Sequence, residues 1–570
     1  MSELWDLTAA EIVAGIRGRE LTASDLVAAL LDRAAEVEPE VLAWATLDAQ
    51  GAAAEARVRD DRVAEGVIGP LQGVPVGIKD IIDVAGLPTI AGFEPFRDRV
   101  AERDAEIVAR LRTAGAIILG KTHTTQFAHG DPAPTRNPWN AERTPGGSSS
   151  GSAAAVAARM VPLAVGTQTA GSVLRPAAYC GVVGFKPSFN WVDRAGVLPL
   201  AWSLDHVGLF ARTVADVALV FGAVSGTSLD LDADGPAAPR IVLLPEFLER
   251  AEPPVRDHLL DVATRLREAG ASVEERSLPV DLDVLLAVHH VIMASEVSAV
   301  HAEALAADPA SYGPVIRLTI ETGQLIPAAY LLKAQRLRRQ IARAIDEALA
   351  GIDGFLLPTA SNPAPPRRST GDRAFQAPWT LVGAPSITLP TGLTEDGLPI
   401  GSQLVGRRGG DARLLALAAW SARKLGLIAA PEIRLPEPEP IAEPEPLPEE
   451  PEAVGAGELP TSEPVPAAGE SEASEQPVEP TAPESDLPAS AEEPVERPVE
   501  PAEPTEASSG RATAADTAVE PFHTESPAGG AIESRSDVPK PGTDLADAAG
   551  EADQPTAPPH PERGEPPEGA

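Results

Sequence analysis

One stretch, residues 143–187, constrains the fold more than any other part of the chain. It holds two turns rich in glycine and serine, at 146–152 and 166–172, with a run of small residues at 153–159 between them. Glycine lets the backbone adopt positive φ and lets another group approach closely. Valine, leucine and methionine are interleaved with the turns, which a flexible linker would not need. The stretch therefore predicts two tight turns packed together inside a folded core.

These turns carry a resemblance to a known family. The runs GGSSSG at 146–151 and GTQTAGS at 166–172 resemble the signature of the amidase signature family, and the resemblance spans residues 21–425. It implies an α/β fold, namely one large domain at residues 1–431 whose mixed central β-sheet is covered by helices. It also implies amide hydrolysis without a cofactor, with Ser172 as nucleophile, Ser148 as bridging serine at a cis peptide and Lys79 as base.

The proposed base must be neutral to accept a proton. Its pKa must therefore lie far below the ordinary value of about 10.4. Burial among the apolar residues at 73–78 would lower it. Asp80 and Asp83 would work against this if they faced Lys79, so we expect them to point elsewhere or to pair with arginine.

The resemblance places an oxyanion hole in the loop before the nucleophile. Its donors would be the backbone N–H groups of Thr169, Ala170, Gly171 and Ser172. Many family members have aspartate and glycine where this chain has Gln168 and Ala170. Alanine tolerates fewer backbone conformations than glycine, so the resemblance alone does not fix the geometry of this loop.

Arg175 follows the predicted nucleophile by three residues. This spacing resembles malonamidase-type members of the family, in which the arginine binds a carboxylate of the substrate. A guanidinium can hold a carboxylate through two parallel hydrogen bonds. The structural alternative is a salt bridge to an aspartate or glutamate of the protein.

Several other polar residues are candidates for the site. His123 and Gln126 stand near the positions where the family has asparagine and glutamate, and His123 is a candidate for the wall of the substrate channel. Asp205 and His206 are adjacent, so they should point to opposite faces and not form a conventional serine–histidine–aspartate triad. The aspartates at 230–234 lack the spacing of a calcium loop, and we expect no metal. Between residues 236 and 332 the pocket candidates stay unranked: His289, His290, Met293, Glu296, His301 and Tyr330.

Periodicity and turn residues predict further elements. Helices are expected at 4–35, 104–113, 213–224, 333–349 and 411–425, and strands at 74–82, 116–119, 354–358 and 385–390, followed by a closing strand motif at 397–406. A capping box is expected at Thr22 to Asp25.

The charge of the chain is concentrated in its last quarter. Of 84 acidic residues, 33 lie from position 435 onward, against 5 basic ones, with a single aromatic ring, Phe522. Such a composition cannot bury enough apolar surface to offset its chain entropy. We therefore predict a disordered tail, rich in proline, glutamate and alanine, at residues 432–570.

The remaining expectations concern compartment and partners. There is one cysteine, no basic and apolar leader at the start, and no apolar run of about 20 residues. We expect a cytoplasmic protein that binds neither membrane nor, given its acidity, nucleic acid. The leading function is hydrolysis of a small amide, with a carboxylate on the substrate as an option. The alternatives are an A-subunit-like component of a tRNA-dependent amidotransferase and a non-catalytic scaffold with an acidic recruitment tail. A homodimer stays open.

Overall fold

The structure is a computed structural model, and it describes residues 3–232 and 235–433. Within these residues eleven strands form one sheet in the order β1-β3-β2-β4-β6-β5-β10-β11-β9-β7-β8. The strands are β1 Trp44–Leu47, β2 Pro75–Lys79, β3 Ile117–Thr122, β4 Leu163–Gln168, β5 Val183–Lys186, β6 His206–Ala211, β7 Arg240–Leu243, β8 Ser272–Glu275, β9 Gly354–Pro358, β10 Ser386–Leu393 and β11 Pro399–Val405. The predicted tail lies outside the described residues except for 432 and 433, and so does Asp234.

The sheet is mixed. Strand β2 lies parallel to both β3 and β4, and β7 lies parallel to β8 and β9. The strands from β4 through β6, β5, β10 and β11 to β9 pair antiparallel. The predicted α/β domain with a mixed central sheet is confirmed.

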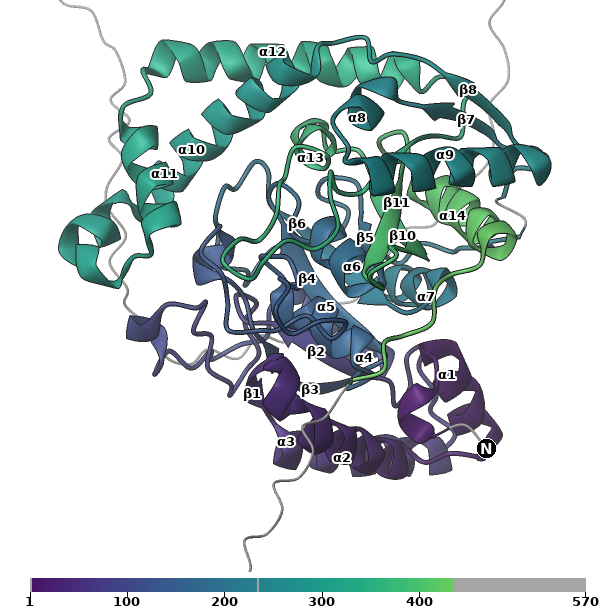
Figure 1. Cartoon of the computed structure of the whole chain (residues 1–570). Helices are drawn as coiled ribbons and strands as arrows, with labels where there is room; N and C mark the ends of the chain where they lie inside the picture. Colours follow the sequence, from purple (N-terminus) through teal and green to yellow (C-terminus); the bar gives the residue numbers. More distant parts are fainter. Residues whose placement is uncertain (1–2, 233–234, 434–570) are drawn as a thin grey trace, which may run out of the picture. The chain divides into compact units, whose positions relative to one another are not determined.

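Helices cover the sheet and extend beyond it (Figure 1). Helix α3 packs on β3, α9 packs on β8, β9 and β11, and α14 packs on β10 and β11. The α-helices are α1 Ala9–Gly18, α2 Ala23–Val41, α3 Ala49–Ala64, α4 Glu106–Ala114, α5 Ser150–Ala157, α6 Leu174–Cys180, α7 Val214–Ser225, α8 Pro245–Glu249, α9 Pro253–Glu268, α10 Leu282–Ala307, α11 Pro314–Gln324, α12 Ala328–Ala348, α13 Ala377–Val382 and α14 Asp411–Leu425. Four short 3-10 helices are Leu4–Asp6, Glu94–Phe96, Gln126–Ala128 and Pro309–Ser311.

Helix α5 is the packing unit that the small residues predicted. All eight of its residues are buried, and a helix that is apolar on every side belongs in a core. It packs against β2, β3, β4, β6 and α6. Because its residues are small, the glycine-rich turn before α5 and the loop after β4 come close together. The Ser149 amide donates to the carbonyl of Ser172, at 3.3 Å.

Most of the predicted elements are present. Strand β9 and helix α14 have the predicted bounds, and α4, α7 and β2 differ from prediction by a few residues. The predicted helical region at 4–35 is broken at Arg19, which has a φ of 59° and ends α1. Thr22 does cap α2 by accepting from Asp25 N, but the reciprocal capping box lies one helix earlier, between Thr8 and Glu11.

Helix α10 qualifies the sequence-based expectation about membrane spans. It is long and apolar enough to cross a membrane, with a mean hydropathy of 1.4 over an 18-residue window, although 56% of that window is buried inside the fold. It packs against α11, α12 and α13 and buries Glu296, His289 and His301. These contacts are those of a core helix in a folded domain.

Candidate active site

Lys79 is the last residue of β2 and is fully buried. Its Nζ forms a hydrogen bond of 2.7 Å with the hydroxyl of Ser148 and one of 2.8 Å with the hydroxyl of Thr167. Among the described residues no carboxylate lies within ion-pair distance of this amine. Burial therefore holds the pKa of Lys79 well below its ordinary value, and the charge of Asp205 offsets this only in part.

The two aspartates that follow Lys79 in the chain are engaged elsewhere. Asp80 forms a buried ion pair with Lys121, at 3.0 Å, and accepts from the amides of Ile90 and Ala91. Asp83 pairs with Arg99 at 2.7 Å. Both aspartates thus face away from Lys79, as expected, although the partner of Asp80 is a lysine and not an arginine.

Ser148 lies in the glycine-rich turn before α5, with no exposed surface. The peptide bond between Gly147 and Ser148 is cis. Gly146 has a φ of 81°, and a Cβ there would lie 2.8 Å from the Cα of Pro176. A larger residue at 146 would therefore push the turn away from α6.

Ser172 lies in the loop between β4 and α6 and is 7% exposed. Its hydroxyl borders the neighbouring pocket, and it makes no hydrogen bond with any other described residue. In particular, no hydrogen bond joins it to the hydroxyl of Ser148. The structure therefore brings Lys79 and Ser148 into contact and leaves Ser172 next to them, open to the pocket.

The loop at 168–174 is held by side chains around it. The amide oxygen of Gln168 accepts from Val173 N at 2.9 Å and from Leu174 N at 3.1 Å. Thr169 is fixed by two contacts: its hydroxyl donates to Asp205 at 2.5 Å, and its carbonyl accepts from His289 Nε2 at 3.0 Å. Gln168, which departs from the common family pattern, thus orders this loop.

The four backbone N–H groups predicted for the oxyanion hole have no acceptor among the described residues. They belong to Thr169, Ala170, Gly171 and Ser172. Ala170 is not among the residues with positive φ, so its methyl group is compatible with the loop. Gly171 is required for a different reason, because a Cβ there would lie 2.3 Å from the side-chain oxygen of Gln376.

A pocket of about 310 Å³ opens at Ser172. Its walls come from the loop at 168–174, from the segment after β3, from α10 and α11, and from the loop between β9 and α13. Among the residues that line it are Thr169, Ser172, Arg175, His129, Met293 and Arg373. Arg368 and Asp372 lie on the same wall as Arg373 and are exposed.

Arg175 lines this pocket but makes no salt bridge with an acidic residue of the described chain. Its Nη2 donates to the carbonyl of Gly147 at 2.7 Å, while its Nε is buried without a partner. Burial lowers the pKa of Arg175 to about 10, and the charge of Arg373 contributes to the lowering. Arg175 therefore contacts the turn that carries Ser148 and keeps a donor unused.

Asp205 and His206 do not form a triad with Ser172. The carboxylate of Asp205 accepts from the Thr169 hydroxyl and from the amides of Leu200 and Ala201. Burial raises its pKa to about 6. His206 Nδ1 instead lies 2.6 Å from the carbonyl of Leu204, and burial lowers the pKa of its ring far below the ordinary value.

The six candidates between 236 and 332 have different places. Met293 lines the pocket, and His289 contacts the loop through Thr169. Glu296 accepts from Ser203 N, and the ring of His301 packs 4.5 Å from that of Phe127. His290 and Tyr330 are exposed, and neither lines the pocket.

His123, a candidate for the channel wall, does not line this pocket. Its backbone binds Ala43 and Gly151. Gln126 instead ties this segment to Ser311 and Gly313, before α11. The histidine that does line the pocket is His129, six residues later. Sequence reasoning also missed Arg373, which sits in a loop with no regular pattern.

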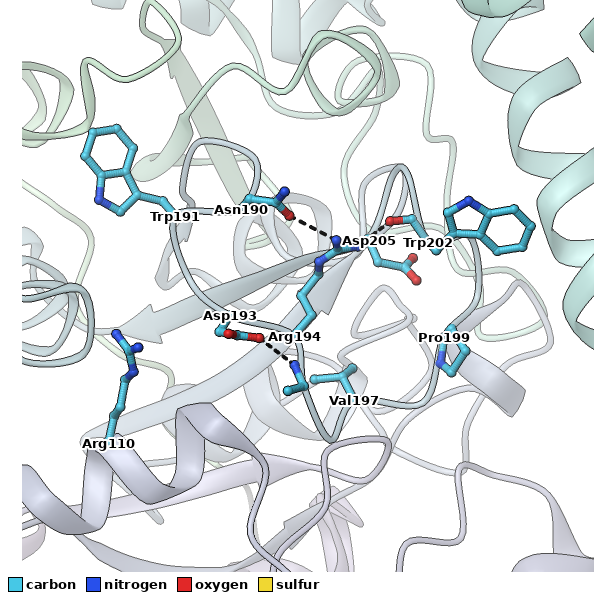
Figure 2. Close-up of a pocket in the computed structure, with 10 residues that line it drawn as sticks. Arg110, Asn190, Trp191, Asp193, Arg194, Val197, Pro199, Trp202 and Asp205 are labelled. Carbon is cyan, nitrogen blue, oxygen red and sulfur yellow. Dashed lines mark hydrogen bonds between the residues drawn. The ribbon is translucent and has the colours of Figure 1, made fainter. Parts of the chain in front are cut away.

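A second, larger pocket of about 630 Å³ is lined by Asp205 and by residues of the segment 190–202 (Figure 2). Arg194 crosses it and donates to Asn190 and to the carbonyl of Trp202. Arg110, at its edge, donates to Glu106 and to the carbonyl of Val224. Both arginines that line this pocket are thus paired within the protein.

No group of three or more histidine, cysteine, aspartate or glutamate side chains suited to a metal ion occurs in the part of the chain that the structure describes.

Comparisons with known proteins show the family of this chain. A family model described as Amidase matches residues 25–415. The chain is 37% identical over 467 residues to the A subunit of the glutamyl-tRNA(Gln) amidotransferase of Roseiflexus castenholzii, and the match covers 73% of this chain and 95% of that protein. It is similar to the crystal structure of an amidase, with 32% identity, a TM-score of 0.69 and coverage of 74% and 100%. It is also similar to the native peptide amidase of Stenotrophomonas maltophilia, with 29% identity, a TM-score of 0.67 and coverage of 75% and 99%.

Proposed function

Because this chain belongs to the amidase family and hydrolyses amide C–N bonds, we propose that Ser172 attacks the scissile carbonyl carbon and forms an acyl-enzyme. The observation that carries this proposal is the buried contact of 2.7 Å between Lys79 Nζ and the Ser148 hydroxyl, without a carboxylate partner for the lysine. A lysine in that environment is a neutral base, which is what a serine nucleophile needs.

The proton then moves along the two serines. As Ser172 Oγ bonds to the carbonyl carbon, its proton passes to Ser148 Oγ, and the proton of Ser148 passes to Lys79 Nζ. The tetrahedral intermediate collapses when the C–N bond breaks, and the leaving nitrogen takes a proton back from the same relay. Water, deprotonated by the relay, attacks the acyl carbon and releases Ser172.

The negative charge on the carbonyl oxygen needs donors. We assign these to the unused N–H groups of Thr169, Ala170, Gly171 and Ser172. Donors that are already oriented stabilise the intermediate without reorganisation, and losing one typically costs about 10²–10³ in rate. The Thr169 contacts to Asp205 and His289 keep this loop in place.

The substrate that the pocket favours is a small amide carrying a carboxylate. The pocket holds about 310 Å³ and is lined by three arginines and one aspartate. Arg175, with its free Nε, is one donor for that carboxylate. The spacing of Arg175 from Ser172 supports the same class, through the resemblance to malonamidase-type members.

A second candidate is an ammonia-supplying component of a tRNA-dependent amidotransferase. The names of the curated relatives favour this candidate over a stand-alone amidase. It predicts that glutamine is the amide donor and that partner subunits are needed for full activity. The third alternative, a non-catalytic scaffold, is not favoured, because the chain belongs to a family of hydrolases. A cytoplasmic location and a homodimeric state remain proposals. Cell fractionation would test the location, and light scattering would test the oligomeric state.

Ammonia release separates these candidates. The full chain should release ammonia from monoamides of small dicarboxylic acids in the absence of other proteins, and Ser172→Ala should abolish that release. Release from glutamine alone, and only with added subunits, would instead favour the amidotransferase. No release from any amide under either condition would contradict both.

A further inference from the structure

The pocket at Ser172 and the larger pocket lined by Asp205 differ in how their polar groups are satisfied. In the larger one, Arg194 and Arg110 are bound by protein acceptors. In the smaller one, next to Ser172, three side chains keep unused donors. Buried polar groups normally have a hydrogen-bond partner, so unsatisfied groups around a cavity indicate a ligand. A ligand that fits this pocket should therefore satisfy all three.

His129 is the clearest case. It is 7% exposed, and neither Nδ1 nor Nε2 has a partner among the described residues. Burial and the nearby charge of Arg373 lower the pKa of His129 to about 3. The ring is therefore neutral at physiological pH and offers one N–H donor to whatever occupies the pocket.

Arg373 carries the charge of this wall. Its backbone carbonyl accepts from Gln376 and Ala377 at the start of α13, which fixes its position. Its guanidinium makes no hydrogen bond or ion pair within the described chain. Asp372 precedes it, but that carboxylate is exposed and accepts from Ala374 N. The charge of Arg373 lowers the pKa of Arg175, His129 and His289, so it lies among the groups that surround Ser172.

We propose that Arg373 and His129 form the subsite that recognises a carboxylate at the end of the substrate away from the scissile amide, with the free Nε of Arg175 beside them. This inference rests on the proposed function and names its substrate class: the monoamide of a short dicarboxylic acid. The guanidinium of Arg373 supplies the charge, and the neutral imidazole of His129 supplies a further hydrogen bond. Arg175, bound to Gly147, mainly positions the turn of Ser148.

Binding to a variant that cannot turn over tests this subsite separately from catalysis. The full chain carrying Ser172→Ala would be titrated calorimetrically with malonamate, succinamate and glutaramate, and with the matching neutral diamides. At least one monoamide should bind about tenfold or more tighter than its diamide. Adding Arg373→Gln should weaken that monoamide about 10–100-fold, as expected for a lost hydrogen bond to a charged group, and change the diamide less than about twofold.

Control variants separate recognition from folding. Arg367→Gln changes an arginine of the same loop that donates to Pro134 and does not line the pocket, and it should leave all affinities unchanged. His129→Ala should weaken the monoamide about three- to tenfold, whereas His123→Ala, outside the pocket, should not. Unchanged diamide binding in Arg373→Gln shows that the pocket is intact.

Each other outcome contradicts one proposal only. Equal binding of monoamide and diamide, binding of neither, or no effect of Arg373→Gln would overturn the subsite. Discrimination in binding without any hydrolysis by the wild type would retain the subsite and contradict the proposed function. If the wild type hydrolyses monoamides and Arg373→Gln does not change that hydrolysis, the proposed function is retained and the subsite is contradicted.

Discussion

Two buried lysines stand side by side at the ends of neighbouring parallel strands, and they have opposite surroundings. Lys121, near the end of β3, pairs with Asp80 and donates to the Thr89 hydroxyl and the Pro88 carbonyl. The Nζ of Lys79, at the end of β2, lies within hydrogen-bond distance of two hydroxyls and 3.5 Å from one carbonyl. Both have no exposed surface. The main difference between them is that Lys121 has a carboxylate partner, Asp80, and Lys79 has none among the described residues.

This difference decides what each amine can do. A buried ammonium is retained when a carboxylate compensates its lost hydration, and it loses its proton when none does. Burial lowers the pKa of Lys121 too, but Asp80 opposes this, so we expect Lys121 to be a structural cation that joins β3 to the loop after β2. Lys79, held against Ser148, is the base of the proposed mechanism. The chain builds both from one residue type by directing Asp80 to one of them.

The largest expected effect is on catalysis at Lys79. Lys79→Met should reduce kcat/KM by about 10²–10⁴-fold, the usual contribution of a positioned base. Its free energy of unfolding should change by no more than about 1 kcal/mol, because no charge is left unpaired. Ammonia release and urea unfolding of the same protein would check both. A Lys79→Met protein that unfolds far more easily would mean that Lys79 is charged.

The matched change at Lys121 should do the reverse. Lys121→Met leaves the buried carboxylate of Asp80 without its cation, and breaking a buried pair costs about 3–5 kcal/mol. Urea unfolding would measure this loss. The double variant Lys121→Met with Asp80→Asn should recover most of it. If the single variant is as stable as the wild type, the ion pair does not hold this region.

A smaller effect should distinguish the two threonines that accept from these lysines. Thr167→Val removes the hydroxyl that binds Lys79 and should lower kcat about tenfold by leaving the base less well oriented. Thr89→Val removes the corresponding hydroxyl at Lys121 and should cost about 1 kcal/mol of stability without changing kcat. Equal kinetic effects in both variants would contradict the comparison.

The smallest effect is a shift in the pH profile. The Asp205 charge favours the protonated form of Lys79, so Asp205→Asn should lower the pKa of Lys79 further. Activity is lost as pH falls through that pKa, and the acidic limb of kcat/KM should therefore move to lower pH. The shift should vanish near pH 6, where Asp205 itself becomes protonated. Asp216→Asn, a buried carboxylate bonded to Ala10, is the control and should not move the limb.

The residues within family motifs and the elements with clear periodicity were predictable from the sequence, whereas the loops around the pocket were not. The family resemblance identified Ser148 within 146–151 and Lys79 within 73–80, and the structure brings these two residues into contact. Local pattern was sufficient for α14 and β9, whose periodicity and flanking turns are clear. The short strands β1, β7 and β8 were not predicted, because four residues give too little pattern to read.

Part of the pocket wall was missed by sequence reasoning, although Arg175 and Met293 were among its candidates. His129 and Arg373 are 244 positions apart, and only the packing of the loop before α13 against the segment after β3 brings them to one cavity. Their spacing follows no helix or strand period, so no local rule can find them. His123 was a candidate only because it stands near positions where the family has asparagine and glutamate. The histidine that lines the pocket, His129, lies six residues later in a loop, where closeness in sequence says little about side-chain position.

The charge state of Lys79 is the central claim, and it can be observed directly. The chain has six lysines, so ¹³C labelling at lysine Cε gives a spectrum with few signals. Lys79→Met and Lys121→Met identify the two of interest. We predict that at pH 7.5 the Lys79 signal has the shift of a neutral amine while that of Lys121 has the shift of an ammonium. A Lys79 signal that stays in the ammonium position from pH 6 to 9 would contradict the account.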